Sequence, residues 1–283
     1  MSRTTHGMYA DELRAIVADR RSGDSAVVMF SGGVDSLLLA LLAREVYSEV
    51  RLLTIVGVDT PDVERARDGA RRLGLAQEEV EVSLDEILAR RYDVEDDSVR
   101  TLFSWQFVLT HRIAFEKRSV EGLDVLQGDG ADALYGSTTW RIYLRAKDVS
   151  EEEGVSIDEA RTILKRRYYR DSVVKKKGTG HLFEAVAREY GANPIQPYRD
   201  PSLAWVSCLT YSSTRPDRKE FPRVVAAEAF GFDASYAKRV SMQEGSGIYG
   251  DLKTALVEAT GAGSFNSAVR EYVRTASHGK EAE

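Results

Sequence analysis

Four short runs of aliphatic and β-branched residues stand out in the first half of the chain, a composition and length typical of strands. They span residues 26–30, 51–56, 79–83 and 123–127. The segments around them repeat apolar residues at three- and four-residue spacing, which predicts helices. These segments are residues 8–21, 35–47, 61–73 and 101–118. Pro61 suits the first turn of its helix, because proline has no amide hydrogen to lose there.

Strand and helix alternate from about residue 24 to residue 140, which predicts an α/β fold: a parallel sheet with helices on both faces. Beyond Asp132 we expect helices and no further strand. The predicted helices span residues 132–147, 157–170, 180–190, 202–209 and 217–230. We therefore divide the chain into an α/β core over residues 1–140 and a helical half over residues 141–283. No linker separates the two, so we expect one compact unit.

The composition is typical of a globular protein and excludes few classes of protein. The 283 residues are 43% hydrophobic and 30% charged, and no apolar run approaches the roughly 18 residues of a membrane span. The N-terminus has no apolar signal segment, so we expect a cytoplasmic protein. The single cysteine, Cys208, excludes a disulfide within the chain. The net charge of -6 provides no general attraction to nucleic acid.

The strongest chemical signal is the segment Ser31-Gly32-Gly33-Val34-Asp35-Ser36, which joins an apolar strand to a helix. Its two glycines allow the backbone to approach an anion closely, and its two serines and the first helix amides can donate hydrogen bonds to phosphate oxygens. Asp35 would repel a bare phosphate, so its presence indicates a Mg²⁺ ion between the carboxylate and the phosphates. The Gly-Lys-Ser/Thr of a Walker loop is missing.

This hexapeptide resembles the pyrophosphate loop of the N-type ATP pyrophosphatases, which cleave ATP to AMP and pyrophosphate. The resemblance implies an adenine nucleotide alpha hydrolase-like fold (HUP type). It also implies ATP contacts from Ser31, Gly32, Gly33, Asp35 and Ser36, with Asp35 as a Mg²⁺ ligand.

A second segment, Gly128-Asp129-Gly130-Ala131-Asp132-Ala133-Leu134-Tyr135-Gly136, follows another apolar strand. It resembles the Gly-Glu-Gly-Ala-Asp-Glu-Leu-Phe-Gly signature of the synthetase domain of asparagine synthetases. The resemblance implies that Gly128 lines the nucleotide site and that Asp132 is the second Mg²⁺ ligand. Asp129 takes the position of the family's catalytic glutamate. Both carboxylates follow strand ends, where open parallel sheets bind ligands.

A third similarity to the same family lies in the helical half. It comprises residues 197–205, then Lys219, then residues 238–247. The family has a lysine five residues before the acidic residue of an acidic-Gly-x-Gly turn, and this chain has Arg239 there, with Lys238 adjacent. The resemblance implies that Lys238 or Arg239 stabilises negative charge in the transition state. Arginine differs from lysine in the shape of its donor array, so this departure affects the catalytic assignment.

The resemblance also implies main-chain contacts to adenine at Val56 and Gly57, at the end of the second predicted strand. The residues facing the acceptor substrate are not fixed by any motif. The candidates are Ser104, Gln106, Tyr135 and Arg199.

Together these features predict an ATP-dependent, AMP-forming ligase that joins a carboxylate to ammonia or an amine and uses Mg²⁺. Nothing in the chain corresponds to the glutaminase half of asparagine synthetases. The nitrogen is then expected from free ammonia, from an amine substrate or from a separate amidotransferase partner. The sequence leaves the oligomeric state open.

Alternative functions remain at this point. A sulfurtransferase acting on tRNA or a small molecule would share the ATP loop and could use Cys208, and the basic, tyrosine-containing residues 165–177 could contact RNA. The second motif argues against that class. An electron-transfer flavoprotein-type nucleotide binder would have no use for two aspartates able to bind Mg²⁺. A non-catalytic adenine nucleotide-binding protein stays open because of Arg239.

Overall fold

The computed structural model describes residues 4–57, 61–90, 102–135, 139–173, 180–209 and 219–235, together with positions 254, 257 and 258. Five strands form one all-parallel sheet in the order β3-β2-β1-β4-β5. Their bounds are β1 Ser25–Met29, β2 Glu49–Val56, β3 Ala76–Glu81, β4 Asp124–Leu126 and β5 Asn193–Ile195. The strand order reverses at β1, so the carboxyl ends of β1 and β4 meet at the switch point where such sheets bind ligands.

Neighbouring residues of the strands point into two different cores. Val28 and Leu126 pack in one hydrophobic cluster, whereas Val27 and Val125 pack in the other. This is the period-two alternation of a strand whose two faces are both buried. The near-continuous apolar composition of the central strands follows from it.

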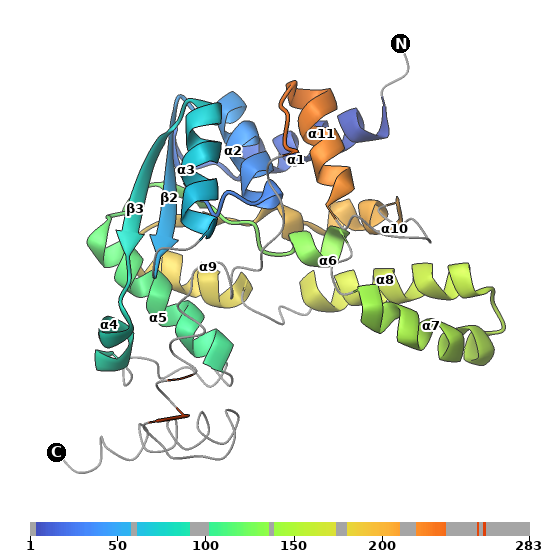
Figure 1. The fold of residues 1–283 in the computed structure, drawn as a ribbon. Helices are drawn as coiled ribbons and strands as arrows, with labels where there is room; N and C mark the ends of the chain where they lie inside the picture. The colour runs from blue at the N-terminus through green and yellow to red at the C-terminus, as the bar shows by residue number, and fades with distance from the viewer. Residues whose placement is uncertain are drawn as a thin grey trace.

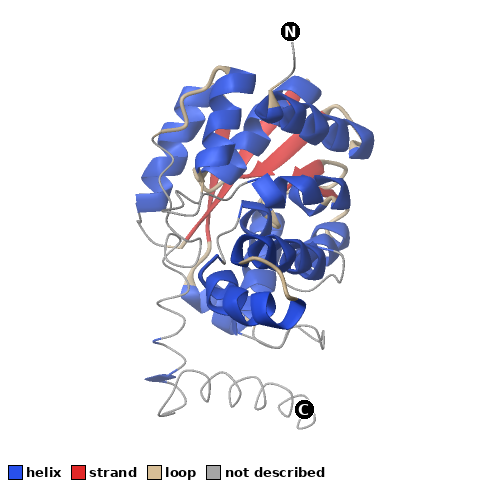
Figure 2. Cartoon of the chain, turned by 90° about the vertical axis from the view of Figure 1, so that its right-hand side faces the viewer, coloured by secondary structure: helices blue, strands red, loops and turns tan. Residues whose placement is uncertain are grey.

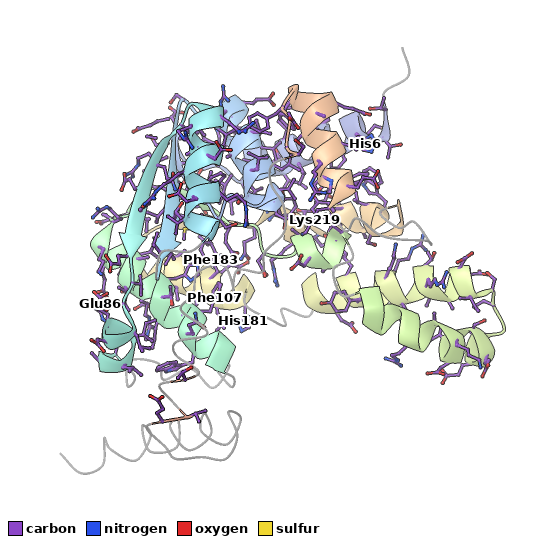
Figure 3. All side chains as sticks on the ribbon, viewed as in Figure 1. His6, Glu86, Phe107, His181, Phe183 and Lys219 are labelled. Carbon is purple, nitrogen blue, oxygen red and sulfur yellow. The ribbon has the colours of Figure 1, made fainter. Side chains whose placement is uncertain are left out.

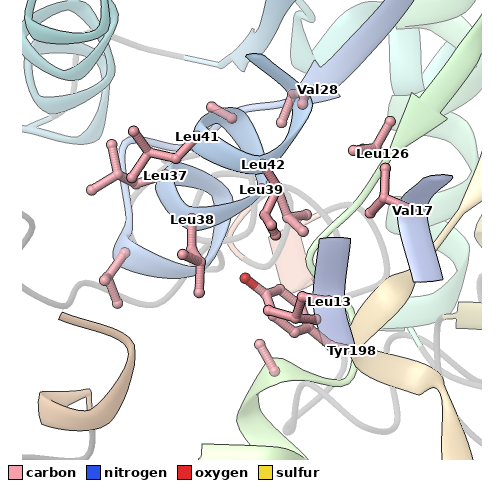
Figure 4. Packing of buried hydrophobic residues seen from close by; sticks show 14 of the residues in the cluster. Leu13, Val17, Val28, Leu37, Leu38, Leu39, Leu41, Leu42, Leu126 and Tyr198 are labelled. Atoms are coloured by element: carbon pink, nitrogen blue, oxygen red, sulfur yellow. The ribbon is translucent and has the colours of Figure 1, made fainter. Parts of the chain in front are cut away.

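One core lies between the sheet and α1 (Thr5–Arg20), α2 (Val34–Val46), α3 (Pro61–Leu73) and α11 (Glu220–Phe230). Figure 4 shows the leucines of α2 at its centre, facing Val28 and Leu126 of the sheet. The other core lies between the sheet and α4 (Leu84–Ala89), α5 (Leu102–Lys117) and α9 (Gly180–Glu189). Helices therefore cover both faces, as predicted, and Figure 2 shows the strands between them.

The remaining elements lie at the carboxyl edge of the sheet or beyond it. They are α6 (Ala131–Tyr135), α7 (Thr139–Glu153), α8 (Ile157–Val173), the 3-10 helices η1 (Pro197–Arg199) and η2 (Pro201–Trp205), and α10 (Val206–Leu209). Helices α7 and α8 pair with each other and stand out from the body in Figure 1. No helix within the described ranges is long and apolar enough to cross a membrane.

The structure corrects the prediction in several places. The expectation of no strand after Asp132 is wrong, because β5 pairs with β4 at the sheet edge. This strand is three residues long and contains Pro194, which an edge strand tolerates, so it carries no periodic signal. The helix predicted over residues 132–147 is instead two, α6 and α7. The division at residue 140 stays a prediction.

A buried aspartate holds the opposite, amino edge of the sheet together. Asp124, fully buried at the start of β4, accepts hydrogen bonds from Ser22, from the hydroxyl of Tyr47 at 2.8 Å and from the side-chain amide of Asn193 at 2.8 Å. Burial by itself would raise the pKa of this carboxyl, but the hydrogen bonds from Ser22 and Asn193 outweigh it and lower the pKa. The group is therefore a structural anion far from the switch point.

Candidate active site

The loop between β1 and α2 turns sharply against α3. Gly32 has φ +70°, and a Cβ atom there would lie 2.6 Å from the backbone nitrogen of Ala66. Only glycine fits both the dihedral angle and the contact. Gly33 then caps α2 without a side-chain hydrogen bond, so no side-chain cap occupies the first amides of the helix. This arrangement suits an anion, and the phosphate contacts expected of the loop stay a prediction.

The two serines of this loop face each other across it. Their hydroxyl oxygens lie 3.3 Å apart, and Ser36 Oγ accepts from the amide of Ser31 and donates to the carbonyl of Gly33. Ser31 is exposed and Ser36 is buried. Ser36 therefore shapes the loop from inside, while Ser31 lies at its accessible surface.

The loop between β4 and α6 packs directly against the first loop. A Cβ atom at Gly128 would lie 3.7 Å from Cβ of Asp35 and 3.9 Å from the ring of Tyr198. Tyr198 is fully buried, and its hydroxyl donates to the carbonyl of Asp35 at 2.8 Å. Figure 4 shows this hydroxyl pointing toward α2. The segment after β5 is thus a third wall of the site; the sequence analysis named residues 197–205 as similar to the family but did not place them beside the two loops.

Lys219, just before α11, joins the acidic residues in the first turns of α2 and α6. Its Nζ lies 2.6 Å from Oδ2 of Asp35 and 2.8 Å from Oδ1 of Asp132. The residue is 5% exposed, and Figure 3 shows it at the start of α11, close to α6. Since both carboxylates touch one nitrogen atom, residues 97 positions apart in the sequence converge on one point. The sequence prediction quoted this lysine only as part of a spacing pattern.

The ring of Tyr135 packs against the Lys219 ammonium. Nζ of Lys219 lies 5.3 Å from the ring centroid of Tyr135, whose hydroxyl is hydrogen-bonded to that of Tyr9 at 2.5 Å. Burial by itself would lower the pKa of Lys219, but attraction to Asp35 and Asp132 outweighs it and raises the pKa above its usual value. The lysine is therefore a fixed cation between the two carboxylates.

The same two carboxylates fit a divalent cation. A positive charge already lies between Asp35 and Asp132, and their ligand atoms are oxygens, which Mg²⁺ prefers. Among the described residues no group of three or more His, Cys, Asp or Glu side chains is placed to hold a metal ion. Mg²⁺ is commonly bound by one or two carboxylates together with water and phosphate oxygens, so two carboxylates fit this ion.

Asp129 lies in a separate ion pair beside this cluster. Nη1 of Arg199 donates to its Oδ2 at 2.6 Å, and the Arg199 side chain is 9% exposed. The pair joins the β4–α6 loop to η1. The sequence named Arg199 only as one of four residues that could face the substrate.

The other predicted residues divide into three groups. Val56 ends β2, and its carbonyl accepts from the amide of Val82, so it takes part in the sheet; the adenine contacts of Val56 and Gly57 stay predictions. Ser104 and Gln106 are buried on α5. Lys238, Arg239 and the side chain of Cys208 lie outside the described residues.

Comparisons with known proteins identify the family of this chain. The family model described as asparagine synthase matches residues 8–240. A comparison with curated proteins found no match. Among solved structures, the chain is similar to an NH3-dependent NAD synthetase from Campylobacter jejuni subsp. jejuni NCTC 11168 in complex with the nitrate ion. The sequence identity is 17%, the match covers 67% of this chain and 94% of that chain, and the TM-score is 0.39. Because the family match spans most of the sequence and includes both glycine loops and Lys219, this chain belongs to the asparagine synthase family.

Proposed function

We propose that this member of a family of ATP-dependent, amide-forming ligases adenylates a carboxylate and transfers the acyl group to ammonia or an amine. The observation that carries the proposal is the convergence of Asp35 and Asp132 on the nitrogen of Lys219. Two carboxylates and a buried cation beside a glycine-rich helix start suit the binding of a metal-bound polyphosphate.

The β1–α2 loop would hold the pyrophosphate part of ATP. The accessible hydroxyl of Ser31 and the first amides of α2 are hydrogen-bond donors, and the helix dipole attracts negative charge. Asp35 and Asp132 would hold Mg²⁺, which neutralises charge on the departing pyrophosphate when bound. Lys219, as a resident cation, adds to that neutralisation.

In the first step an oxygen of the acceptor carboxylate attacks the α-phosphorus. The bond from that phosphorus to the bridging oxygen breaks, and pyrophosphate leaves with the electron pair. In the second step the nitrogen attacks the acyl carbon, the bond to AMP breaks, and one proton leaves the nitrogen. Asp129 would accept this proton, since Arg199 fixes one of its oxygens and so orients the carboxylate. Lys238 or Arg239 would stabilise the negative charge.

Stoichiometric product analysis tests this proposal. Purified protein is incubated with Mg-ATP, a panel of carboxylates and either ammonium or an amine, and AMP and pyrophosphate are quantified. We expect equal amounts of both, dependent on the carboxylate. Asp132→Asn should abolish their formation, whereas Asp85→Asn, at an exposed position on α4, should not. ATP that binds but is never cleaved at the α-phosphorus would favour a non-catalytic nucleotide-binding protein. Cleavage that requires tRNA and sulfide would favour a sulfurtransferase.

A further inference from the structure

Tyr135 carries a hydroxyl where the family signature has a phenylalanine. The residue ends α6 and is 1% exposed, so this additional polar atom lies inside the protein. A buried hydroxyl without a hydrogen bond is costly. Here the hydroxyl of Tyr9, a fully buried residue of α1, lies 2.5 Å from it. The two tyrosines, 126 positions apart in the sequence, therefore satisfy each other.

The ring of Tyr135 contacts each part of the proposed pyrophosphate site. It belongs to the same short helix as Asp132, three residues later. Its centroid lies 5.8 Å from that of Tyr198, whose hydroxyl donates to the carbonyl of Asp35. It also lies 5.3 Å from Nζ of Lys219. A shift of this ring would therefore be transmitted to both acidic residues and to the cation between them.

Lys219 needs a contact besides its two carboxylates. A lysine ammonium sits on a flexible four-carbon stem, so its place is set by what surrounds it. In the proposed function Asp35 and Asp132 share their oxygens with Mg²⁺, which weakens their attraction for the ammonium. The face of an aromatic ring attracts an ammonium, whereas Mg²⁺ prefers oxygen ligands. The ring of Tyr135 can therefore hold Lys219 while the carboxylates bind the metal.

Helix α1 fixes this ring and the start of α11 together. The ring centroid of Tyr9 lies 5.3 Å from that of Phe221, two residues after Lys219, and 6.3 Å from that of Trp205. Helices α1 and α11 also pack against each other. Tyr9 is thus held by neighbours from two other elements, and its hydroxyl is a fixed point for that of Tyr135.

We propose that Tyr9 and Tyr135 are positioning residues. Their paired hydroxyls hold the Tyr135 ring against Lys219, and so keep the ammonium where it meets the pyrophosphate part of ATP. This inference rests on the proposed function, which assigns Lys219 to the departing pyrophosphate. Both tyrosines are buried, so they act through the lysine and not by touching the nucleotide. Helix α1, which lies outside both glycine loops, thereby contributes to nucleotide binding.

Binding of a nucleotide that cannot be cleaved tests this role without catalysis. Protein in saturating Mg²⁺ is titrated calorimetrically with α,β-methylene ATP and, separately, with AMP, which lacks the pyrophosphate. Tyr135→Leu removes the ring and should weaken binding of the ATP analogue about 3- to 30-fold, with the AMP affinity unchanged. In the Lys219→Met background the same substitution should have no further effect, because the ring acts through the lysine.

Tyr9→Phe covers the case in which Tyr135→Leu does not fold. It keeps both rings but leaves the hydroxyl of Tyr135 buried without its partner, so the ring shifts and the ATP analogue should bind about 3- to 10-fold more weakly. Adding Tyr135→Phe removes the stranded hydroxyl and should restore binding. Tyr190→Phe, which removes a hydroxyl bonded to Glu116 of α5, is the matched control and should bind the analogue normally.

The inference is overturned if AMP binding falls as much as analogue binding, or if Tyr135→Leu has the same effect with and without Lys219. It is also overturned if Tyr9→Phe loses stability but its folded form binds the analogue normally, which would mean a purely structural role, or if adding Tyr135→Phe restores nothing. Loss of binding through Lys219 in a protein that never forms AMP would refute the proposed function and leave the positioning role intact. AMP formation with normal analogue binding by both variants would do the reverse.

Discussion

Replacing Lys219 by methionine tests the central geometry of the site. Methionine keeps the length and much of the apolar stem that packs near Tyr135, but it removes the charge that Asp35 and Asp132 share. Removing one partner of a buried ion pair costs about 3–5 kcal/mol. Here the side chains of Asp35 and Asp132 are 27% and 60% exposed, so water screens part of the effect. We expect a loss of about 2 kcal/mol in the free energy of unfolding.

Urea denaturation at pH 7 and low salt, without Mg²⁺ or nucleotide, measures this loss. The control is Lys117→Met, whose pair with Glu86 has both side chains 36% exposed, and it should cost about 0.5 kcal/mol or less. Adding Asp132→Asn to Lys219→Met should restore part of the stability, because it removes one of two repelling charges. Mg²⁺ should raise the denaturation midpoint of Lys219→Met more than that of the unmodified protein.

If Lys219→Met is as stable as the Lys117→Met control, Lys219 does not stabilise the two carboxylates. The same follows if the two substitutions at Lys219 and Asp132 add their separate losses of stability. Additive losses would mean that the carboxylates do not interact through the lysine.

Three further predictions concern the framework of the site. Burial lowers the pKa of His111 to about 4, although its hydrogen bond with the carbonyl of Phe107 opposes the shift. Between pH 7 and pH 5 the unfolded chain therefore binds a proton that the folded chain does not, and the free energy of unfolding should fall by about 2 kcal/mol. Urea denaturation of His111→Gln at the two pH values should not show this part of the fall. Gly32→Ala places a Cβ atom at a residue with a left-handed dihedral angle and against the backbone of Ala66. It should therefore abolish ATP binding, measured by calorimetry, and lower the melting temperature. Gly23→Ala, where a Cβ atom would meet no other atom, should change neither. Asp124→Asn should lower the free energy of unfolding, measured by urea denaturation, by about 2–3 kcal/mol, because it disturbs the hydrogen bonds that Asp124 accepts. The protein that remains folded should bind Mg-ATP with unchanged affinity. Weaker binding by this folded fraction would contradict a purely structural role.

The central strands β1, β2 and β4 could be predicted because their residues, and those that flank β4, are mostly apolar. Residues 61–73 match α3 at both ends, since Pro61 and the periodic apolar face mark it clearly. The edge strand β5 could not be predicted, because its three residues have no period and its pairing comes from β4. Helix α4 was also missed, although Ser83 and Glu86 form a capping box that predicts its start.

The two glycine loops could likewise be predicted from local sequence, but their partners could not. Asp35 and Asp132 lie in short motifs whose residues act together, so spacing identifies them. Lys219 and Arg199 become meaningful only when the chain returns to the sheet edge, 184 residues after Asp35 in one case and 70 after Asp129 in the other. A lone basic residue carries no local pattern that indicates such a contact.

The position of Lys219 in the chain also sets the order in which the site can be assembled. A ribosome releases Asp35 and Asp132 well before Lys219, which contacts them across 184 and 87 residues of sequence. Until α11 packs against α1 and α2, the nascent chain holds these two acidic side chains without the charge of Lys219 between them. The charge balance around Asp35 and Asp132 is thus completed late, and a partly synthesised chain has a β1–α2 loop but not the contact with Lys219. Binding of ATP during synthesis would therefore report the docking of α11.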